Sequence, residues 1–404
     1  MKALHPGTEL GTELGTELGK APELNQSQGI RDFLRSDAAA GRLRALRTPS
    51  IPQFLLAVLF DYSVIALAIC VSELSGSWFL WLPAIVIIAA RQHALLVLMH
   101  EGAHRSVSRN RNLNDLLSDL LCGAPLLIST RSYRKAHLTH HQHLNTEHDP
   151  DWCRKVDNPT DRDQWLFPST LPLWRLLGNL YSHSVLYLLK TLSDNQRTEP
   201  TDSVSPSQTS RSSNNPATEQ VTEQVTERSP GAKPANVLSD ATLANLKYVL
   251  YAIAGVALTL TSTWSGLVLY WLAPMFLVLP LIMRIRSIAE HFALRHDHPL
   301  RQTRTVRAGR LERLLIAPHY IGLHIDHHLA ASVPFYQLPR LHSLLLECSD
   351  YRANAHLNDG YFIRRSTRDQ PSRGLFSADL YGSPSVALQS SATPQDNAVK
   401  TATS

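Results

Sequence analysis

Residues 78–104 read WFLWLPAIVIIAARQHALLVLMHEGAH, an apolar run that ends in two histidines, His100 and His104. A helix rises about 1.5 Å per residue, so a helix from Trp78 to His100 would be roughly 33 Å long, close to the hydrocarbon thickness of a bilayer. Residues four apart share one face of a helix, so both imidazoles can reach one metal ion. The stretch therefore predicts a membrane-spanning helix with two metal ligands just past the membrane boundary.

Three further apolar runs have nearly the same length, at residues 51–71, 243–261 and 267–283. A spanning helix needs about 20 apolar residues, and a buried core helix is the alternative for any single run. The four runs form two pairs, and the connection within each pair is very short. We therefore expect an all-α integral membrane protein with about four transmembrane helices.

The distribution of arginine predicts the orientation in the membrane. The connections within the pairs, at residues 72–77 and 262–266, contain no lysine or arginine. The outer ends of the pairs carry arginines, namely Arg44, Arg47, Arg105, Arg109, Arg111, Arg284 and Arg286. The positive-inside rule then places both termini and every histidine cluster in the cytoplasm, and we expect a multi-pass protein of a bacterial inner membrane. Because the net charge of +5 comes mainly from arginines beside apolar runs, no nucleic-acid partner is expected.

Polar segments of low complexity predict the domain limits. Residues 7–18 read GTEL three times, and residues 193–235 are rich in Ser, Thr, Gln, Asn and Pro, so neither stretch can build a core. We expect a disordered N-terminal tail at 1–30, a disordered insert at 193–235 and a disordered C-terminal tail at 366–404. The membrane domain then comprises residues 31–192 and 236–365. The N-terminus lacks the features of a cleaved signal peptide.

Three stretches are too short or too interrupted to span a membrane but are amphipathic. They are the basic residues 31–47, residues 113–128 and residues 165–190. Amphipathic helices of this kind lie along a membrane surface. We expect interfacial helices at these positions.

Two more histidine clusters follow the first. His137, His140 and His141 lie in HLTHH, and His324, His327 and His328 lie in HIDHH. Spacings of three and four place side chains on one helix face, and the adjacent pair in each cluster offers ligands to two neighbouring metals. A zinc site takes four ligands, so eight imidazoles indicate two metal ions. The sequence predicts a cytoplasmic, histidine-rich helical cap that holds them.

The ligand type alone does not identify the metal. Imidazole binds iron, copper, zinc and nickel alike. The four cysteines lie far apart and form no CxxC pair, which disfavours a disulfide framework or a thiolate zinc site.

The motifs HEGAH, HLTHHQH followed by DPDW, RSIAEHF and HIDHHLAASVPFYQLPRLH resemble those of the membrane fatty acid desaturase family. Its relatives include acyl hydroxylases and carotenoid ketolases. The matching stretch runs from about residue 100 to 340, interrupted by the insert. The resemblance implies a di-iron centre that activates O2 and removes hydrogen from an unactivated C–H bond. It also implies an external reduced electron donor, either a ferredoxin or a cytochrome b5-like protein.

The resemblance also implies the ligand set, and no catalytic residue beyond the ligands. By position the implied iron ligands are His100, His104, His137, His140, His141, His291, His324, His327 and His328. Ligating imidazoles usually donate their second N–H to an acceptor, often a carboxylate. Candidates for such a supporting role are Asp149, Asp151, Glu101, Glu290, Asp326 and His143.

Two polar residues fall inside the predicted spans. For His93, a structural role is favoured over support of the metal site. Asp61 is either a group of the substrate channel or a residue bonded inside the helix bundle. The third histidine cluster also departs from the form typical of simple acyl desaturases, since Gly322 and Leu323 precede His324 and Asp326 replaces a frequent Glu. These departures leave the substrate class open.

The favoured function is desaturation of a fatty acyl chain in a lipid. Hydroxylation or ketolation of a lipid or carotenoid is the runner-up, because the same ligands can support both outcomes. A non-catalytic metal transporter is a third candidate, but transporters place their ligands near the middle of the membrane and these clusters lie past the span ends. An inactive scaffold is disfavoured by the intact clusters.

Overall fold

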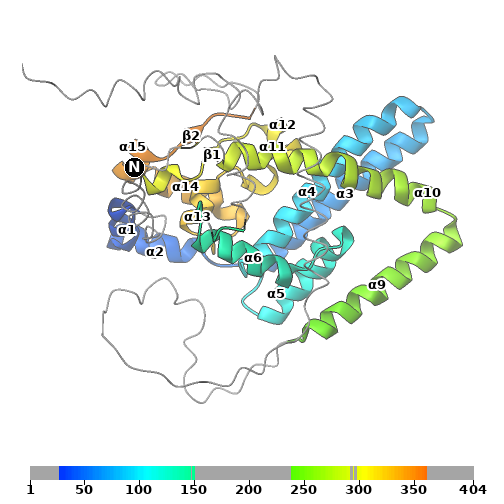
Figure 1. The fold of residues 1–404 in the computed structure, drawn as a ribbon, viewed down its shortest axis with the longest axis horizontal. Helices are drawn as coiled ribbons and strands as arrows, with labels where there is room; N and C mark the ends of the chain where they lie inside the picture. The colour runs from blue at the N-terminus through cyan, green and yellow to red at the C-terminus, as the bar shows by residue number, and fades with distance from the viewer. Residues whose placement is uncertain (1–26, 147, 151–237, 292–293, 295–297, 362–404) are drawn as a thin grey trace, which may run out of the picture.

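Helices form nearly all the regular structure in the described part of the chain (Figure 1). The structure is a computed structural model that describes residues 27–146, 148–150, 238–291, 294 and 298–361. The predicted insert, the predicted C-terminal tail and the predicted interfacial helix at 165–190 lie outside these residues. The last residues of the predicted N-terminal tail are among the described residues. There α1 (Gln28–Arg35) begins, and the Ser27 side chain accepts the N–H of Ile30. The helix thus starts before the predicted tail boundary at residue 30.

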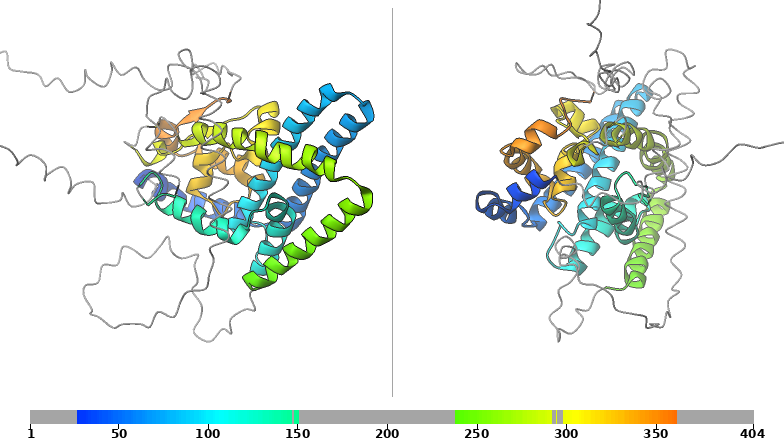
Figure 2. Two further views of the ribbon diagram at one scale, coloured as in Figure 1. Left: turned by 45° about the vertical axis from the view of Figure 1, so that its right-hand side comes forward. Right: turned by 60° about the vertical axis from the view of Figure 1, so that its left-hand side comes forward.

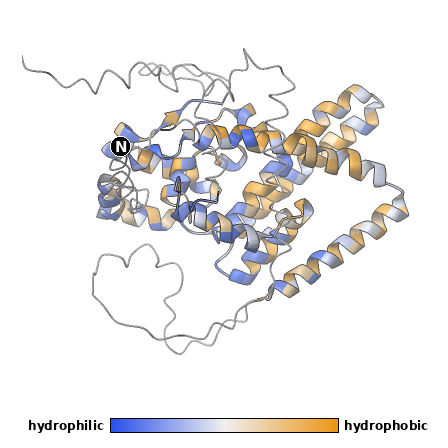
Figure 3. Cartoon of the chain, in the orientation of Figure 1, coloured by the Kyte–Doolittle hydropathy of each residue, from blue (hydrophilic) through white to orange (hydrophobic). Residues whose placement is uncertain are grey.

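Four helices in the described residues are long and apolar enough to cross a membrane, as the four apolar runs predict. They are α3 (Ile51–Ser75), η1 with α4 (Trp78–Leu80 and Trp81–Ala103), α9 (Asp240–Thr261), and a composite helix at Trp264–His291. The composite helix joins α10 (Trp264–Leu267), the π-helical turns η5 (Val268–Leu272) and η6 (Pro274–Val278), and α11 (Leu279–His291). Figure 3 shows that apolar residues dominate both hairpins of long helices, as lipid contact requires.

The first hairpin is closed by a glycine turn. Gly76 ends α3 with a left-handed φ of 61°, and its N–H donates to the Glu73 carbonyl. Glycine adopts this conformation without steric cost. α4 then returns along α3, and the two helices pack through Phe54, Val58, Ile65, Ile88 and Leu95 (Figures 1 and 2). From Ile88 onward nearly every residue of α4 is buried, so this helix is the centre of the fold.

The second hairpin is asymmetric. α11 packs on α4, whereas α9 diverges from the bundle and Leu243 is its one buried residue (Figures 1 and 2). Three polar contacts hold α9: Arg131 NH1 lies 2.5 Å from Asp240 Oδ1, Lys247 Nζ lies 3.3 Å from Asp119 Oδ2, and the Tyr251 hydroxyl donates to the Ala124 carbonyl at 2.8 Å. The remaining apolar surface of α9 is open to lipid.

The segment between the hairpins is less regular than the predicted interfacial helix at 113–128. It consists of α5 (Arg111–Ser118), the π-helical turn η2 (Asp119–Gly123), the 3-10 turn η3 (Ala124–Leu126) and α6 (Thr130–Gln142). Three carbonyls in it accept hydrogen bonds from the spans, each at 2.8 Å, from the hydroxyls of Tyr62 and Tyr251 and from Trp271 Nε1. Asp119 caps α6 by accepting the Thr130 N–H at 2.7 Å. The segment therefore orients α6, which carries the second histidine cluster.

The C-terminal part of the described chain forms a second core with α1 and α2 (Asp37–Leu46). It contains η7 (Pro299–Arg301), β1 (Thr305–Val306), α12 (Arg310–Leu315), η8 (Pro318–Tyr320), α13 (His324–Leu329), η9 (Phe335–Gln337), α14 (Leu338–Leu345), α15 (Ser349–Asn354) and β2 (Leu357–Asn358). β1 and β2 pair in parallel. The predicted basic stretch 31–47 buries Ala39 and Leu43 in this core, beside Ile30. Its amphipathic pattern thus reflects contacts within the protein, and its location on a membrane surface stays a prediction.

Gly102 marks the closest approach of α4 and the segment that follows it. A Cβ on Gly102 would lie 2.2 Å from both Cβ and Oγ of Ser118. We expect Gly102→Ala to lower the free energy of unfolding by about 1–3 kcal/mol, the cost of overpacking. A Cβ on Gly255 in α9 would instead meet no atom within 4 Å. Gly255→Ala should therefore leave stability unchanged or raise it by about 0.5–1 kcal/mol. Thermal unfolding of both variants in detergent would show the difference, and equal midpoints would contradict the close approach.

Candidate metal centre

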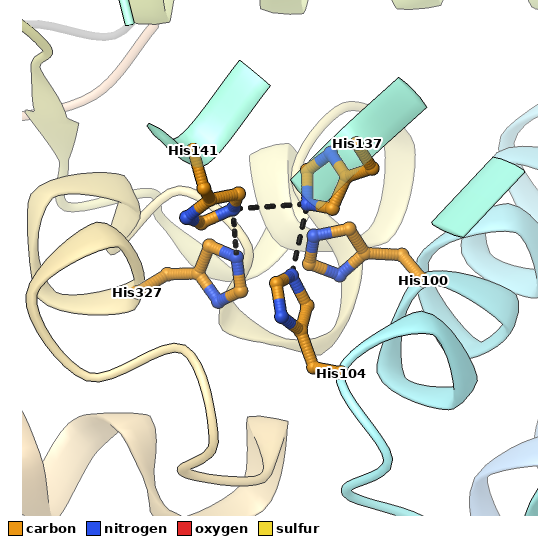
Figure 4. Close-up of side chains that lie close together, drawn as sticks. All are labelled: His100, His104, His137, His141 and His327. Carbon is orange, nitrogen blue, oxygen red and sulfur yellow. Dashed lines mark hydrogen bonds between the residues drawn. The ribbon is translucent and has the colours of Figure 1, made fainter. Parts of the chain in front are cut away.

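The nine histidines predicted as ligands come together where the ends of α4, α6, α11 and α13 meet. One group, the five-histidine group, contains His100, His104, His137, His141 and His327, whose ligand atoms all lie within 4.8 Å of one another (Figure 4). A second group contains His140, His291 and His328, and an overlapping third contains Glu290, His291 and His324. We call the second and third together the four-histidine group. No predicted histidine ligand is left out of these groups.

Helix periodicity explains how the side chains divide. In α6, His137 and His141 are one turn apart and both enter the five-histidine group, whereas His140 enters the other. In α13, His324 and His328 are one turn apart and enter the four-histidine group, whereas His327 enters the first. Each adjacent histidine pair is therefore shared between two groups, as expected from the sequence for two neighbouring metal ions.

The nitrogen spacing within the groups fits shared coordination. Nε2 of His137 lies 2.9 Å from Nε2 of His104 and 3.0 Å from Nε2 of His141, pairs that are joined by dashed lines in Figure 4. In the other group, Nε2 of His324 lies 2.9 Å from that of His291 and 3.1 Å from that of His328. Two imidazoles bound about 2.0–2.1 Å from one ion at 90–110° would have nitrogens about 2.8–3.4 Å apart. The residues therefore fit a pair of metal ions.

Burial favours the neutral form of four of these imidazoles. It lowers the pKa of His104 to about 3, with the nearby charge of Arg134 adding to the effect. Burial, followed by the neighbouring imidazoles, also lowers the pKa of His137, His141 and His328 well below the usual 6.5. Neutral imidazole is the form that binds metal. At neutral pH these four imidazoles are thus in the protonation state that coordination requires.

Asp149 supports a histidine in the way the sequence predicts. Its Oδ1 lies 2.9 Å from His140 Nδ1, and its Oδ2 accepts the Asn145 N–H at 3.0 Å. The side chains of His140 and Asp149 are buried, at 5% and 0% exposure. A carboxylate at Nδ1 holds the proton on that nitrogen and leaves Nε2 as the coordinating atom.

Glu290 lies at the edge of the four-histidine group. Its Oε2 is 3.6 Å from His324 Nδ1, and its Oε1 accepts from Arg286 Nε at 2.7 Å. Arg286, which the sequence suggested as a membrane-flanking charge, is therefore used inside the protein. The i,i+4 spacing of Arg286 and Glu290 is a signal that could have revealed this ion pair.

Two of the predicted supporting carboxylates are bonded elsewhere. Glu101 accepts from the Ser106 hydroxyl at 2.7 Å and from the Phe335 N–H at 3.0 Å, which ties α4 to η9. Asp326 accepts from the Tyr351 hydroxyl at 2.7 Å and from Thr305 Oγ1 at 3.3 Å. The bonds described for both carboxylates go to other residues, and the expectation that they orient ligand imidazoles stays a prediction. They fix the helices that carry the ligands.

Of the other two supporting candidates, one lies among the described residues and stays outside the groups. His143 is half-buried and its ring lies 5.6 Å from that of His148, outside all three groups. Asp151 lies outside the described residues.

Sequence reasoning missed Arg134. Its Nε donates to the Ala103 carbonyl at 2.9 Å and its NH2 group donates to the Gly102 carbonyl at 2.7 Å. These are carbonyls at the C-terminal end of α4, where a cation is favourable. Arg134 thus joins the helix of the first cluster to that of the second.

The unusual Gly322 has a steric reason. A Cβ at Gly322 would lie 2.6 Å from the Val306 carbonyl oxygen, and the Gly322 carbonyl accepts the Val306 N–H at 2.7 Å. The close approach of β1 therefore requires glycine just before the third cluster.

Comparison with known proteins gives consistent matches. The family model described as fatty acid desaturase matches residues 76–359, which include all nine histidines. The chain is 25% identical to dihydrorhizobitoxine desaturase of Bradyrhizobium elkanii over 317 residues, 77% of this chain and 80% of that protein. It is 28% identical over 141 residues to sn-1 acyl-lipid omega-3 desaturase (ferredoxin) of Nostoc sp. (strain 36), which is 34% of this chain and 36% of that protein. It is 33% identical over 110 residues to the chloroplastic sn-2 acyl-lipid omega-3 desaturase (ferredoxin) of Arabidopsis thaliana, 26% of this chain and 24% of that protein.

Proposed function

Because this chain belongs to the fatty acid desaturase family and is an oxidoreductase by that membership, we propose that it is a membrane di-iron enzyme that uses O2 to introduce a double bond into a fatty acyl chain of a lipid. The observation that carries the proposal is the division of nine histidines into two adjoining groups. The choice of iron rests on the family, since imidazole itself accepts several metals.

The proposed ligands divide between the two ions. One ion would be held by His100, His104, His137, His141 and His327. The other would be held by His140, His291, His324 and His328, with Glu290 beside it. When bound, the irons would supply the O2-dependent oxidation that removes hydrogen from an unactivated C–H bond.

The protein's own residues prepare the centre. Burial shields part of the centre from water, since His100, His140 and His327 are each at most 5% exposed. Asp149 holds the His140 ring by its Nδ1, and Arg286 offsets the charge of Glu290. These contacts hold the His140 ring and the Glu290 carboxylate in place before metal arrives.

The electron balance implies a partner. Removing two hydrogens from a saturated chain while O2 leaves as two water molecules requires two more electrons and two protons. An external donor must supply the electrons, and a ferredoxin is favoured because the names of two relatives include it. We place the donor, both termini and the centre on the cytoplasmic side of a bacterial inner membrane, from the arginine distribution.

The substrate class is proposed from the relatives that act on acyl lipids. The names of the Nostoc and Arabidopsis relatives specify acyl-lipid substrates. The relative with the longest match is named for dihydrorhizobitoxine, so this compound should be included among the substrates tested.

The test is expression in a host of defined lipid composition, followed by mass spectrometry of its lipids and pigments. We expect an acyl species lighter by two hydrogens, which His140→Ala abolishes. A product heavier by one oxygen would favour hydroxylation, and a keto product would favour ketolation. Metal exchange without O2 consumption would favour a transporter and contradict the proposal.

A further inference from the structure

A buried ion pair joins the two helices of the first hairpin. Arg91 NH1 in α4 lies 2.9 Å from Asp61 Oδ1 in α3, and the side chains are 2% and 0% exposed. Charged residues inside membrane spans are costly and mark functional positions when they are retained. The structure answers the question that the sequence left open for Asp61, because this carboxylate is bonded inside the bundle.

Both partners also reach a third segment, which leads to the third histidine cluster. The other carboxylate oxygen of Asp61 lies 2.8 Å from His319 Nε2. Arg91 NH2 donates to the Leu314 carbonyl at the end of α12. The three side chains therefore form one bridge, the Asp61–Arg91–His319 bridge, from α3 and α4 to the segment between α12 and α13.

The backbone at this attachment is unusual. His319 and Tyr320 have φ values of 51° and 60°, so two consecutive residues with side chains adopt the left-handed conformation. Such residues are held in it only where the surrounding contacts determine their position. Contacts here include the Asp61 bond of His319, an edge-on contact of the His319 and Phe335 rings with centroids 5.0 Å apart, and the Arg313 guanidinium 5.0 Å from the centre of the Tyr320 ring.

The bridge joins α4, which carries His100, to the segment that leads into α13, which carries His327 of the same group. His324 is the first residue of α13, and His319 lies five residues before it. On α4, Arg91 lies nine residues before His100. The rings of His100 and His327 lie 4.5 Å apart in the five-histidine group. A displacement of α13 relative to α4 would separate these two rings.

We propose that the Asp61–Arg91–His319 bridge is a positioning device that holds α13 against α4, so that His327 and His100 can share one metal ion. The inference rests on the proposed function. It adds three positioning residues to the proposed centre, and none of the three belongs to the histidine groups. The bonded, buried side chains and the left-handed turn are its evidence.

The test measures metal binding by the full-length, metal-free protein in detergent, with Co(II) alone as the probe. His319→Asn tolerates the left-handed turn but is too short to reach Asp61. We expect its Co(II) affinity at one site to fall about 10–100-fold, the usual effect of losing a residue that orients a ligand. The visible absorption of the bound Co(II) should change as well, because a ligand is displaced.

His298→Asn is the matched control. His298 is also a partly buried histidine beside a carboxylate, with Nε2 3.6 Å from Asp350 Oδ1, but it lies outside the groups. Its Co(II) affinity and spectrum should equal those of the wild type. If His319→Asn does not fold, Arg91→Lys serves instead, because lysine keeps the charge beside Asp61 but has no second arm for the Leu314 carbonyl.

The outcomes separate the two proposals. Wild-type protein that binds no metal would reject the proposed function itself. A second result is that the wild-type protein binds two Co(II) per chain and that His319→Asn or Arg91→Lys gives the same affinity and spectrum. This result would contradict the role of the bridge and leave the proposed function standing. Weaker Co(II) binding with an altered spectrum in the variant, and not in His298→Asn, supports it.

Discussion

Replacing His141 by alanine should lower turnover by more than about 100-fold, the upper end of the effect expected from a residue that only orients a ligand. The reason is its place in the centre. His141 Nε2 lies 3.0 Å from that of His137 and 3.3 Å from that of His327, and its ring stacks at 4.1 Å on His328 of the other group. Its loss therefore removes a proposed ligand and the packing between the two groups.

His143→Ala is the matched control for this prediction. His143 follows His141 by two residues but lies outside all three groups. We expect its turnover to stay within about twofold of wild type, as for ordinary substitutions away from a site. Metal content per chain and O2 uptake with substrate would be measured for both variants. Equal losses in the two variants, or two metal ions retained by His141→Ala, would show that the groups are not the metal centre.

The four spans could be predicted because a membrane helix depends mainly on local properties. In lipid each backbone polar group must be bonded within its own segment, so a long apolar run is nearly sufficient. The π-helical turns around Pro274 could not be predicted in the same way, because they depend on how the composite helix packs on α4. The shape of the 113–128 segment likewise depends on donors from distant helices, such as Tyr62 and Trp271.

The histidines themselves were predictable from spacing, and the supporting carboxylates only in part. Neighbouring residues on a helix point about 100° apart. Glu101 follows His100 directly and Asp326 precedes His327 directly, so their carboxylates point away from the rings and bond to other elements. Asp149 lies beyond the end of α6 and can return toward His140 through a turn. Proximity in sequence was therefore a poor guide to these contacts.

The orientation signal illustrates a second limit. Arginines at the ends of spans were interpreted as charges facing the cytoplasm. Arg286 is bonded to Glu290 beside the candidate centre, and Arg284 is 4% exposed. A count of arginines does not distinguish surface charge from internal ion pairs, because burial is a property of the fold.

Acidification should destabilise the metal-free protein strongly between about pH 7 and pH 5. Burial lowers the pKa of several clustered imidazoles in the folded state, to about 3 for His104. The others outside the spans whose pKa is well below 6.5 are His137, His141, His327 and His328. Below pH 6.5 the unfolded chain takes up protons that the folded cluster excludes, so unfolding becomes more favourable as the pH falls. Each pH unit below 6.5 costs up to about 1.4 kcal/mol per imidazole.

The sign of the effect distinguishes this mechanism from a general loss of charge balance. Above the unfolded pKa of about 6.5 these imidazoles are neutral in both the folded and the unfolded chain, so they do not lower the free energy of unfolding. Below it, the free energy of unfolding declines until the pH reaches the lowered pKa values of the folded state. The thermal midpoint of the metal-free protein in detergent, measured from pH 7.5 to 5.5, should therefore fall steadily. His104→Gln removes one titrating group and should flatten the dependence. Bound metal competes with protons for the same nitrogens, so the metal-loaded protein should resist acid until the metal dissociates. A midpoint independent of pH in this range would mean that the imidazoles are not held neutral by burial.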